Sequence, residues 1–431
     1  MAKRVIFVDC VSTSLNFIKD AQDEGLIPVV LELPWIKKYN PLHYNYTAFG
    51  AKKPEVIQAT HKYDQNLRMV KKLNPIAIIP CTDNSIELAL RLSKDLGLPS
   101  SPYENFPKMR DKLECQKALK EFGIRSIETI VYTTYPVALK FFKEHDKKVI
   151  VKPAQGTSSV NVFICRNEKQ LMNAIDCCTA PGEGLTSGQV LIQELIEGEE
   201  IVINTCSCRG IQKVTSIWEY VKKEVPGYSP VYVLLKFMEP TDPKYTKIIE
   251  YNSKVLQAIG LTYGLCHNEF KVDKKGPVLI EANCRTPGGS MQGKFLDFVL
   301  GHHETNVSLW AYTNEKKFME FKRNYKHCPN YGGMKFLVVP YRMYVKRDRF
   351  KECFKNIESY LYSNFGALFH AKNQWLEKTI DYHTTGGIIF LANTNYDQIM
   401  KDYHYILNME EHHFDKLFDI DKEKTRKANH L

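Results

Sequence analysis

The chain has 431 residues, more than one ordinary hydrophobic core accommodates, and therefore indicates two or three domains. With 44% apolar and 25% charged residues it has the composition of a soluble globular protein, and no apolar run approaches a membrane span. The formal net charge of +10 is modest and mostly evenly spread, which disfavours a nucleic-acid-binding module and suits small anionic ligands such as ATP.

Twelve cysteines are scattered through apolar segments without the spacing of metal ligands. The adjacent Cys177 and Cys178, and the pair Cys206 and Cys208, lack Cys-x-x-Cys geometry, so we interpret them as packed thiols. The N-terminus enters a strand pattern within a few residues, so we expect no signal peptide. These features predict a cytoplasmic protein with reduced cysteines and with neither a membrane nor a nucleic-acid partner.

Strand and helix patterns alternate through the first hundred residues. Strands are predicted at residues 3–9, 27–31 and 76–80, and helices at residues 15–24, 64–73 and 84–96. This alternation is typical of an α/β domain, which we place at residues 1–108. No Gly-x-Gly-x-x-Gly follows the first strand, so a dinucleotide-binding dehydrogenase is disfavoured. Thr82 and Asp83 could touch a substrate, but a helix cap is the favoured interpretation.

The next segments carry lysines beside a polar loop. A helix beginning near residue 109 has Asp111 and Lys112 at its start, and a strand at residues 148–152 ends in Lys152. A loop of small and hydroxylic residues follows, before a second strand ending at Cys165. Such a loop can turn its backbone N–H groups toward phosphate oxygens, and the lysine adds a compact positive charge. An ordinary polar hairpin loop is the alternative.

Two apolar runs, residues 263–272 and 277–282, are separated by the charged sequence Asp-Lys-Lys-Gly, which predicts an antiparallel hairpin. Glu269 and Glu281 then lie on paired strands. Asn283 and Arg285 follow at the two-residue spacing of a strand, so we expect these four side chains on one face. Carboxylate and amide oxygens suit Mg²⁺, and a guanidinium suits phosphate.

The alternative is that this face of the hairpin is exposed to solvent and binds nothing. The strands of the hairpin are too apolar, however, to be exposed on all sides. The following Pro287-Gly288-Gly289 is a turn whose bare backbone allows close approach of a ligand.

Together, over roughly residues 3–405, these motifs resemble the ATP-grasp superfamily of carboxylate–amine ligases. The segments His267-Asn268-Glu269 and Pro287-Gly288-Gly289 are most similar to the branch that holds L-amino acid ligases and carnosine synthase. The resemblance implies an ATP-grasp fold of the α/β class, with α+β character in the ATP-binding part. It places the ATP-grasp domain at residues 109–312, with a mobile lid at about 127–195, and a small C-terminal α/β domain at residues 313–431.

The resemblance also assigns roles to side chains. Those implied for ATP are Lys112, Lys152, Ser158, Ser159, Gln193, Glu194, Ile196 and Glu200, with Glu199 competing with Glu200 for the ribose. Those implied for Mg²⁺ or Mn²⁺ are Glu269, Glu281 and Asn283. Arg285 would be catalytic, and His267, Gly288 and Gly289 would contact the substrate. Many family members have glycine where this chain has Asn161, an acceptable change because asparagine tolerates positive φ.

Further elements complete the prediction. Strands are expected at residues 190–196, 201–206, 332–340 and 382–392, and helices at residues 167–178, 243–259, 295–311, 350–362 and 396–407. The adjacent His302 and His303 are interpreted as surface residues of the helix at 295–311, because neighbouring helical positions do not face together.

The expected reaction follows from the resemblance and from the chemistry of carboxylates. A carboxylate does not react with an amine at neutral pH, because its leaving group would be oxide. Transfer of the γ-phosphoryl group of ATP gives an acyl phosphate, which the amine attacks with release of phosphate. We expect two amino acids as substrates, ADP and phosphate as further products, and an enzyme that could form a homodimer.

Three alternatives stay open. A ligase of another substrate class would join an amino acid to a different amine or to a peptide. Carboxyphosphate chemistry like that of biotin carboxylase would depend on bicarbonate. A nucleotide-binding scaffold would bind ATP without releasing phosphate.

Overall fold

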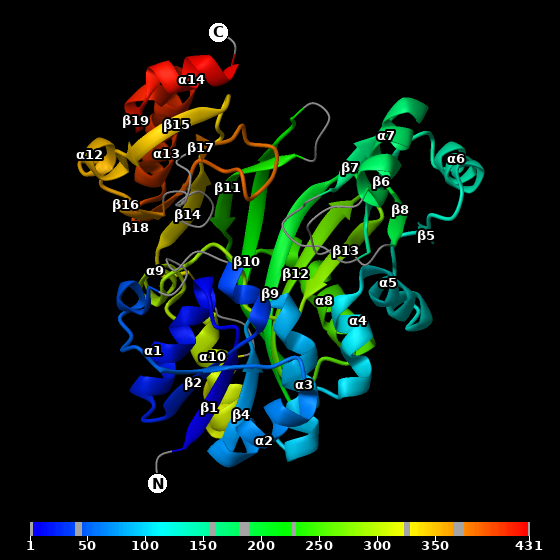
Figure 1. Cartoon of the computed structure of the whole chain (residues 1–431), viewed down its shortest axis with the longest axis vertical. Coiled ribbons are helices and arrows are strands. Elements are labelled where there is room, and N and C mark those ends of the chain that lie inside the picture. Colours follow the sequence, from blue (N-terminus) through cyan, green and yellow to red (C-terminus); the bar gives the residue numbers. More distant parts are fainter. Residues whose placement is uncertain are drawn as a thin grey trace.

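The computed structural model describes residues 3–38, 45–154, 161–180, 189–225, 230–322, 328–364 and 375–429. Within these ranges the strands form four sheets, and helices pack against them (Figure 1). The α/β class predicted from the sequence is confirmed. All twelve cysteines carry free thiols, and Cys178, Cys206 and Cys208 are buried as expected. The interpretation of Cys177 as a packed thiol was wrong, because Cys177 is exposed while its helical neighbour Cys178 faces the core. None of the described helices is both long and apolar enough to cross a bilayer.

The N-terminal sheet is parallel, in the order β3-β2-β1-β4. Its strands are β1 (Arg4–Val8), β2 (Ile27–Glu32), β3 (Glu55–Gln58) and β4 (Pro75–Pro80), and its helices are α1 (Asn16–Asp23), α2 (Tyr63–Leu73) and α3 (Ile86–Leu96). Residues 5–8 of β1 are fully buried, as expected for a parallel strand covered on both faces. Parallel α/β sheets bind ligands beyond the carboxyl ends of their strands. At this edge of the sheet, Thr13, which follows β1, bonds to Gly288, and Asp83, which follows β4, bonds to Arg285.

An eight-stranded sheet forms the centre of the molecule, in the order β13-β12-β9-β10-β11-β14-β18-β16 (Figure 1). Its strands are β9 (Glu199–Cys208), β10 (Ile211–Lys223), β11 (Val231–Phe237), β12 (Gly264–Asp273), β13 (Gly276–Asn283), β14 (Tyr331–Phe336), β16 (Tyr360–Asn364) and β18 (Ile388–Asn393). The sheet thus continues across the domain boundary predicted near residue 312. The largest hydrophobic cluster lies on it, with Trp218, Phe270 and Phe295 almost completely buried.

A smaller antiparallel sheet, the lid sheet, has the order β5-β8-β6-β7. Its strands are β5 (Thr129–Val131), β6 (Val149–Pro153), β7 (Phe163–Cys165) and β8 (Val190–Glu194), covered by α6 (Tyr135–Glu144) and α7 (Glu168–Thr179). It has a hydrophobic cluster of its own and projects from the body of the molecule (Figure 1). This part coincides with the predicted lid at about residues 127–195, whose mobility stays a prediction.

The C-terminal part packs around a three-stranded sheet of β15 (Met343–Asp348), β17 (Trp375–Leu376) and β19 (Phe418–Ile420). Its helices are α12 (Phe350–Phe354), α13 (Tyr396–His412) and α14 (Lys422–Asn429). The remaining helices are α4 (Phe106–Arg110), α5 (Lys112–Glu121), α8 (Thr246–Ala258), α9 (Gly293–Leu300), α10 (Glu304–Thr313) and α11 (Glu315–Glu320).

Two of the predicted helices are wrong in extent. The helix expected at residues 295–311 breaks at Gly301, whose φ of 75° is the left-handed conformation that ends α9. The helix expected at residues 350–362 stops at Phe354, and the chain enters β16, where Tyr362 stacks on Phe390 with ring centroids 4.1 Å apart. Pairing of β16 with β18 outweighs the local helical pattern there.

The interpretation of His302 and His303 as surface residues was also wrong. They lie between α9 and α10, where His302 Nε2 is 2.8 Å from the Thr215 carbonyl oxygen. His303 Nε2 is 2.7 Å from Asp20, and its Nδ1 is 2.7 Å from Asp297. Burial alone would lower the pKa of His303, but these two carboxylates raise it to about 10.

Candidate active site

The hairpin of β12 and β13 forms as predicted. Its register pairs His267 with Asn283 and places Glu269 directly opposite Glu281. Directly opposed residues on antiparallel strands have their Cβ atoms within about 5.5 Å of each other. Two carboxylates therefore come together on one face, which is favourable only if positive charge surrounds them.

A lysine and a histidine lie next to this pair. Lys112 Nζ lies 2.8 Å from Glu281 Oε1, and His267 Nε2 lies 3.4 Å from Glu269 Oε1. Burial would raise the pKa of Glu269, but His267, Lys222 and Arg285 outweigh it and lower the pKa to about 2. The carboxylate of Glu269 is therefore ionised at neutral pH and can bind a cation.

Arg285 lies just beyond the hairpin and is held by three groups. Its Nε donates to Asp83 Oδ2 at 3.1 Å, its Nη2 to Asn283 Oδ1 at 3.4 Å, and its Nη1 to the Thr286 carbonyl oxygen at 2.9 Å. Burial would raise the pKa of Asp83, but the positive charges of Arg285 and Arg110 lower it. The guanidinium is thereby fixed beside the two glutamates.

This contact corrects the interpretation of Asp83 as a helix cap. Thr82 takes the cap position, and its backbone N–H bonds to the Ser85 hydroxyl at 3.0 Å. Asp83 instead extends from the end of β4 to Arg285, 202 residues later in the chain. No local pattern indicates such a contact.

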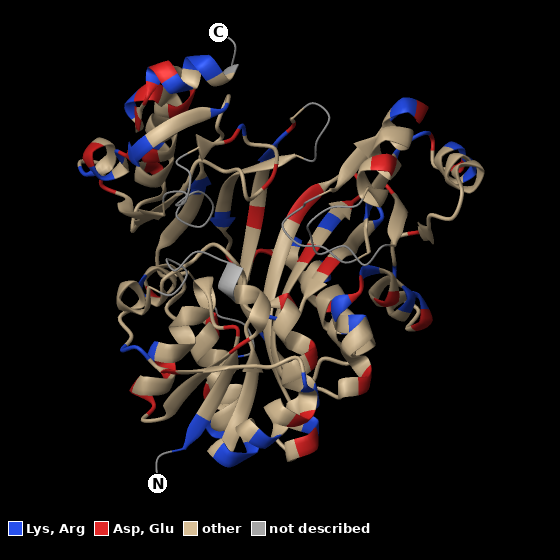
Figure 2. Ribbon diagram, in the orientation of Figure 1, with Lys and Arg blue, Asp and Glu red and all other residues tan. Residues whose placement is uncertain are grey.

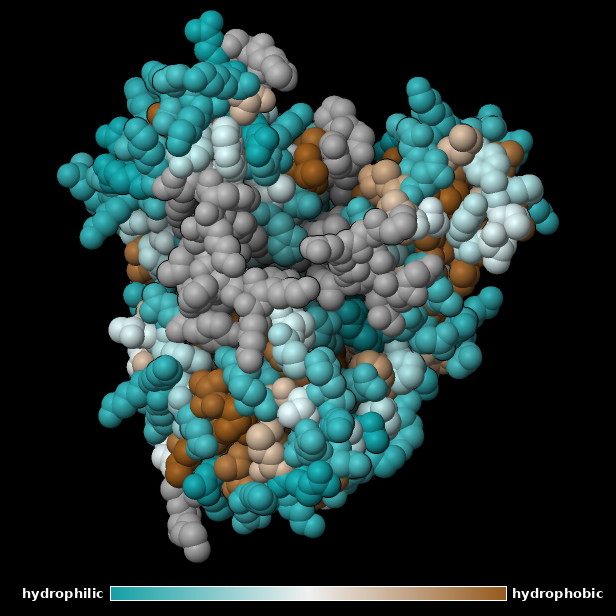
Figure 3. All heavy atoms as spheres, in the orientation of Figure 1, coloured by the Kyte–Doolittle hydropathy of each residue, from teal (hydrophilic) through white to brown (hydrophobic). Residues whose placement is uncertain are grey.

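A large cavity of about 490 Å³ lies between the lid sheet and the central sheet. In Figure 3 the lid and the C-terminal part stand apart at the top of the molecule, and Figure 2 shows charged positions along strands of the central sheet. The lining includes most of the residues that the sequence assigned to ATP: Lys112, Lys152, Gln193, Glu194, Ile196, Glu199 and Glu200. Ser158 and Ser159 lie outside the described residues.

Lys152 is near the end of β6 and is only 5% exposed. Burial, followed by the positive charge of Lys112, lowers its pKa to about 8. Just beyond the undescribed loop, Asn161 has a φ of 55°, so asparagine does adopt the left-handed conformation expected at this position.

The strand β8 and the turn after it line the large cavity on the side of the lid sheet, next to β6. The Gln193 side chain bonds to Thr129 Oγ1 at 2.8 Å, so it is held within the lid sheet. Glu200 forms an ion pair with Lys222 and another with Lys271 at 3.2 Å, whereas Glu199 is exposed. Glu200 is therefore the better ordered of the two candidate carboxylates.

A small chamber of about 120 Å³ adjoins the large cavity. Its lining unites all the residues that the sequence assigned to metal, catalysis and substrate: His267, Glu269, Glu281, Asn283, Arg285, Gly288 and Gly289. Tyr220, Glu269 and Glu281 line both spaces and so form a shared wall. A group bound in one space can therefore meet a group bound in the other at the two carboxylates.

The rest of the chamber is aromatic and was not predicted. Tyr220 and Tyr232 have ring centroids 4.7 Å apart, Tyr232 and Phe336 5.7 Å, and Phe336 and Tyr382 6.2 Å. Trp218 continues this wall beside His267, at 5.2 Å. The alternation of Trp218, Tyr220 and Lys222 along β10 was a usable signal, but Phe336 and Tyr382 had none.

The N-terminal part holds the glycine turn of the chamber in place. Thr13 Oγ1 donates to the Gly288 carbonyl oxygen at 2.9 Å, and Ser290 N donates to Ser12 Oγ at 3.0 Å. The Gly293 N–H donates to Asn16 Oδ1 at 2.8 Å. These contacts orient the backbone next to Arg285, and the sequence analysis missed them.

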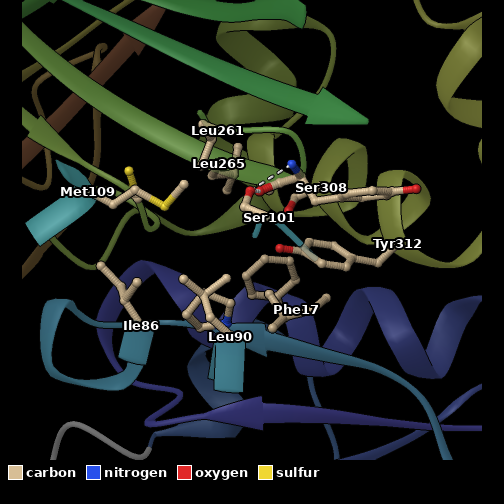
Figure 4. Close-up of a pocket in the computed structure, with 14 residues that line it drawn as sticks. Phe17, Ile86, Leu90, Ser101, Met109, Leu261, Leu265, Ser308 and Tyr312 are labelled. Atoms are coloured by element: carbon tan, nitrogen blue, oxygen red, sulfur yellow. Dashed lines mark hydrogen bonds between the residues drawn. The ribbon is translucent and has the colours of Figure 1, made fainter. Parts of the chain in front are cut away.

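A further void lies at the junction of the N-terminal part and the central sheet (Figure 4). It measures about 10 Å³ and is lined mainly by apolar side chains, among them Phe17, Leu90 and Tyr312. Ser101 at its edge accepts a hydrogen bond from the Tyr263 N–H at 3.0 Å. The void has room for no more than about one water molecule, so it is not a substrate site.

The donor set of the hairpin fits a divalent metal ion. Glu269 and Glu281 supply carboxylate oxygens, and Asn283, paired with His267 next to them, supplies an amide oxygen. Such hard oxygen ligands suit Mg²⁺ or Mn²⁺. Among the described residues, no group of three or more His, Cys, Asp or Glu side chains is placed to hold a metal ion, so the amide is needed to complete three protein ligands.

Comparisons with known proteins agree with this geometry. Residues 145–293 match the ATP-grasp domain family. Dapdiamide A synthase from Enterobacter agglomerans is 26% identical over 345 residues, which cover 77% of this chain and 80% of that protein. The L-arginine-specific L-amino acid ligase from Bacillus subtilis is 24% identical over 234 residues, 54% of this chain and 55% of that protein. The crystal structure of L-amino acid ligase from Bacillus licheniformis has the same fold, with a TM-score of 0.72, 16% identity and coverage of 97% and 98%.

Proposed function

We propose that the chain is an ATP-grasp carboxylate–amine ligase, which activates the carboxylate of an L-amino acid as an acyl phosphate and joins it to the amine of a second amino acid. The products would be a dipeptide, ADP and phosphate. The observation that carries this proposal is the wall that Tyr220, Glu269 and Glu281 share between the two spaces. A carboxylate bound in the chamber would lie within reach of a phosphoryl group bound in the large cavity.

The large cavity would hold ATP. Its volume of about 490 Å³ lies within the usual range for small-molecule sites. Lys112 and Lys152 would contact the phosphates, the backbone near Glu194 and Ile196 would bond to adenine, and Glu200 would hold the ribose. Because the two lysines and Glu281 lie at the end nearest the chamber, the γ-phosphate would point toward the acyl donor.

Glu269, Glu281 and Asn283 would hold Mg²⁺ or Mn²⁺. When bound, the ion would neutralise charge on the triphosphate during phosphoryl transfer. In the described structure Lys112 forms an ion pair with Glu281, and His267 Nε2 lies 3.4 Å from Glu269, so each carboxylate already has a nitrogen partner at the proposed metal site.

Arg285 would stabilise the transferring phosphoryl group and then the tetrahedral intermediate. The planar guanidinium group can donate hydrogen bonds to two oxygens at the same time. The hydrogen bond from its Nε to Asp83 fixes its orientation. Gly288 and Gly289, with His267, would border the substrate at the same place. Attack by the amine forms the C–N bond as the C–O bond to phosphate breaks, and the nitrogen loses a proton.

The test is phosphate release from ATP across a panel of amino-acid pairs, with mass spectrometry of the products. We expect ADP, phosphate and a dipeptide. AMP and pyrophosphate would indicate adenylation, bicarbonate-dependent ADP formation would indicate carboxyphosphate chemistry, and ATP binding without phosphate release would indicate a scaffold. We also propose that the enzyme acts in the cytoplasm on small soluble substrates, and it could do so as a homodimer.

A further inference from the structure

The aromatic chamber has a composition that restricts the side chain of its ligand. Apart from the shared-wall glutamates, Arg285 and His267, every residue that lines it is uncharged. Leu235, Met291 and Met334 complete the wall formed by the aromatic rings. A ligand group that enters the chamber beyond Arg285 therefore meets no further charged side chain, only rings, tyrosine hydroxyl groups, methylene groups and thioethers.

The charged groups of the chamber are already committed by the proposed chemistry. Arg285 would take the reacting carboxylate, and Glu281 is paired with Lys112. Glu269 would hold the metal ion together with Glu281 and lies 3.4 Å from His267 Nε2. No second carboxylate is left for a lysine or arginine side chain, and no second arginine or lysine lines the chamber for an acidic one.

The size of the chamber sets a second limit. Its volume of about 120 Å³ is somewhat smaller than a cavity of about 150 Å³ that accommodates benzene. The ring contacts from Tyr220 to Tyr382 make its wall continuous, and Met334 closes it at the glycine turn, where a Cβ on Gly289 would lie 2.8 Å from Met334 Cε. Close-packed walls of this kind expand little.

We propose that this chamber binds the side chain of the acyl-donor amino acid and selects a small, uncharged aliphatic group, from alanine to leucine in size. The proposal rests on the ligase function above, because it assumes that the donor carboxylate lies at Arg285.

The first experiment measures kcat/KM for phosphate release with a fixed amine and a series of donors. The donors are alanine, valine, leucine, phenylalanine, arginine and glutamate, and each dipeptide is sequenced by tandem mass spectrometry to show which amino acid supplied the carbonyl. We expect the three aliphatic donors to exceed the others by about tenfold or more, since one or two misplaced carbons in an apolar pocket cost this much.

Two variants change the chamber in opposite directions. Gly288→Ala adds a methyl group where the nearest heavy atom outside the turn is the Tyr382 hydroxyl at 3.9 Å, so it should fit and narrow the space. We expect it to lower kcat/KM for leucine more than for alanine. Met334→Ala should widen the chamber and raise the ratio of phenylalanine to alanine. Met343→Ala removes the same atoms from a buried position in the C-terminal core, away from the chamber, and should leave the ratio unchanged.

The outcomes separate the two proposals. Phosphate release that favours phenylalanine, arginine or glutamate as the donor would overturn the selection of small aliphatic groups and leave the ligase function intact. Donor ratios that Gly288→Ala and Met334→Ala leave unchanged, while ATP affinity stays normal, would show that the donor side chain lies elsewhere. Absence of phosphate release with every pair would instead contradict the ligase function itself.

Discussion

The large cavity and the small chamber share one wall but are built in different ways. The large cavity lies between two sheets and presents charged side chains from both, including Lys152 of the lid sheet and Glu200 of the central sheet. The chamber lies on the central sheet and presents aromatic rings. Charged side chains can attract a polyphosphate even if one wall of the cavity moves. Selection of a ligand by its shape, in contrast, requires a cavity with rigid walls.

The large cavity and the chamber also differ in how firmly the rest of the structure holds their walls. The lid sheet has its own small hydrophobic cluster and adjoins the body along one side. The chamber, in contrast, is held by the main core and by hydrogen bonds from Thr13 to the glycine turn. We therefore expect changes in the large cavity to alter ATP binding and changes in the chamber to alter turnover.

The largest effect should come from the shared wall. Glu281→Gln removes a carboxylate that faces both spaces, and we expect phosphate release to fall by about 10³-fold or more, because a lost metal contact costs several kcal/mol in the transition state. Activity of the wild type should require Mg²⁺ or Mn²⁺. Glu114→Gln, which breaks an exposed ion pair with Lys117, serves as the control and should change little. Normal activity of Glu281→Gln would rule out the metal assignment.

The second prediction compares Arg285, which lines the chamber, with Lys152, which lines the large cavity. Arg285→Ala should lower kcat by about 10²-fold to 10³-fold while ATP affinity changes little, because the arginine acts mainly on the transferring group. Lys152→Ala should weaken ATP binding as well as turnover. Arg285→Lys should restore little, because an ammonium lacks the fork.

The measurements for this pair are calorimetry of ATP binding and kcat from phosphate release. If Arg285→Ala loses ATP affinity as severely as Lys152→Ala and turns over normally once saturated, the two residues have the same role and the comparison between the spaces fails.

A smaller effect is expected at Asp83, which orients Arg285 from outside the chamber. Asp83→Asn keeps the shape but removes the charge, and we expect kcat to fall about tenfold or more with unchanged ATP affinity, since small misplacements of reacting groups are costly. Asp95→Asn, which changes an exposed carboxylate bonded to the Tyr63 hydroxyl, is the control. A variant that loses thermal stability but keeps kcat would assign Asp83 a structural role alone.

The smallest effect is a pH dependence of ATP binding. The pKa of Lys152 is lowered to about 8 in the free protein, so the lysine is charged below that pH and loses its proton above it. Binding of ATP above pH 8 then requires uptake of a proton, and affinity should fall by up to about tenfold as one charge-assisted contact is lost. Calorimetry from pH 7 to about 9.5 would measure it, and Lys152→Arg should abolish the fall because arginine stays charged.

Local patterns determined the hairpin and much of the scaffold. A two-residue period and a short charged turn are properties of neighbouring residues, so they sufficed to place Glu269 opposite Glu281. The strand that ends near Lys152 and the alternating elements of the N-terminal sheet were predictable for the same reason. The domain boundaries remain predictions, and the central sheet runs through the one near residue 312.

Where the local prediction was wrong, contacts between distant segments had decided the structure. The helix expected at residues 350–362 yields to strand pairing with β18, and Asp83 leaves the cap position to Thr82 to neutralise Arg285. The break at Gly301 was visible as a glycine, but its left-handed conformation depends on how α9 and α10 pack.

The sequence by itself thus determined which carboxylates meet at the shared wall, because Glu269 and Glu281 are close together in the chain. Only the tertiary structure decided the shape of the chamber beside them. Trp218, Phe336 and Tyr382 come from segments far apart in sequence and meet only when the sheet and the C-terminal part are assembled. The shape of a cavity is the sum of such long-range contacts, and no local period of hydrophobicity encodes it.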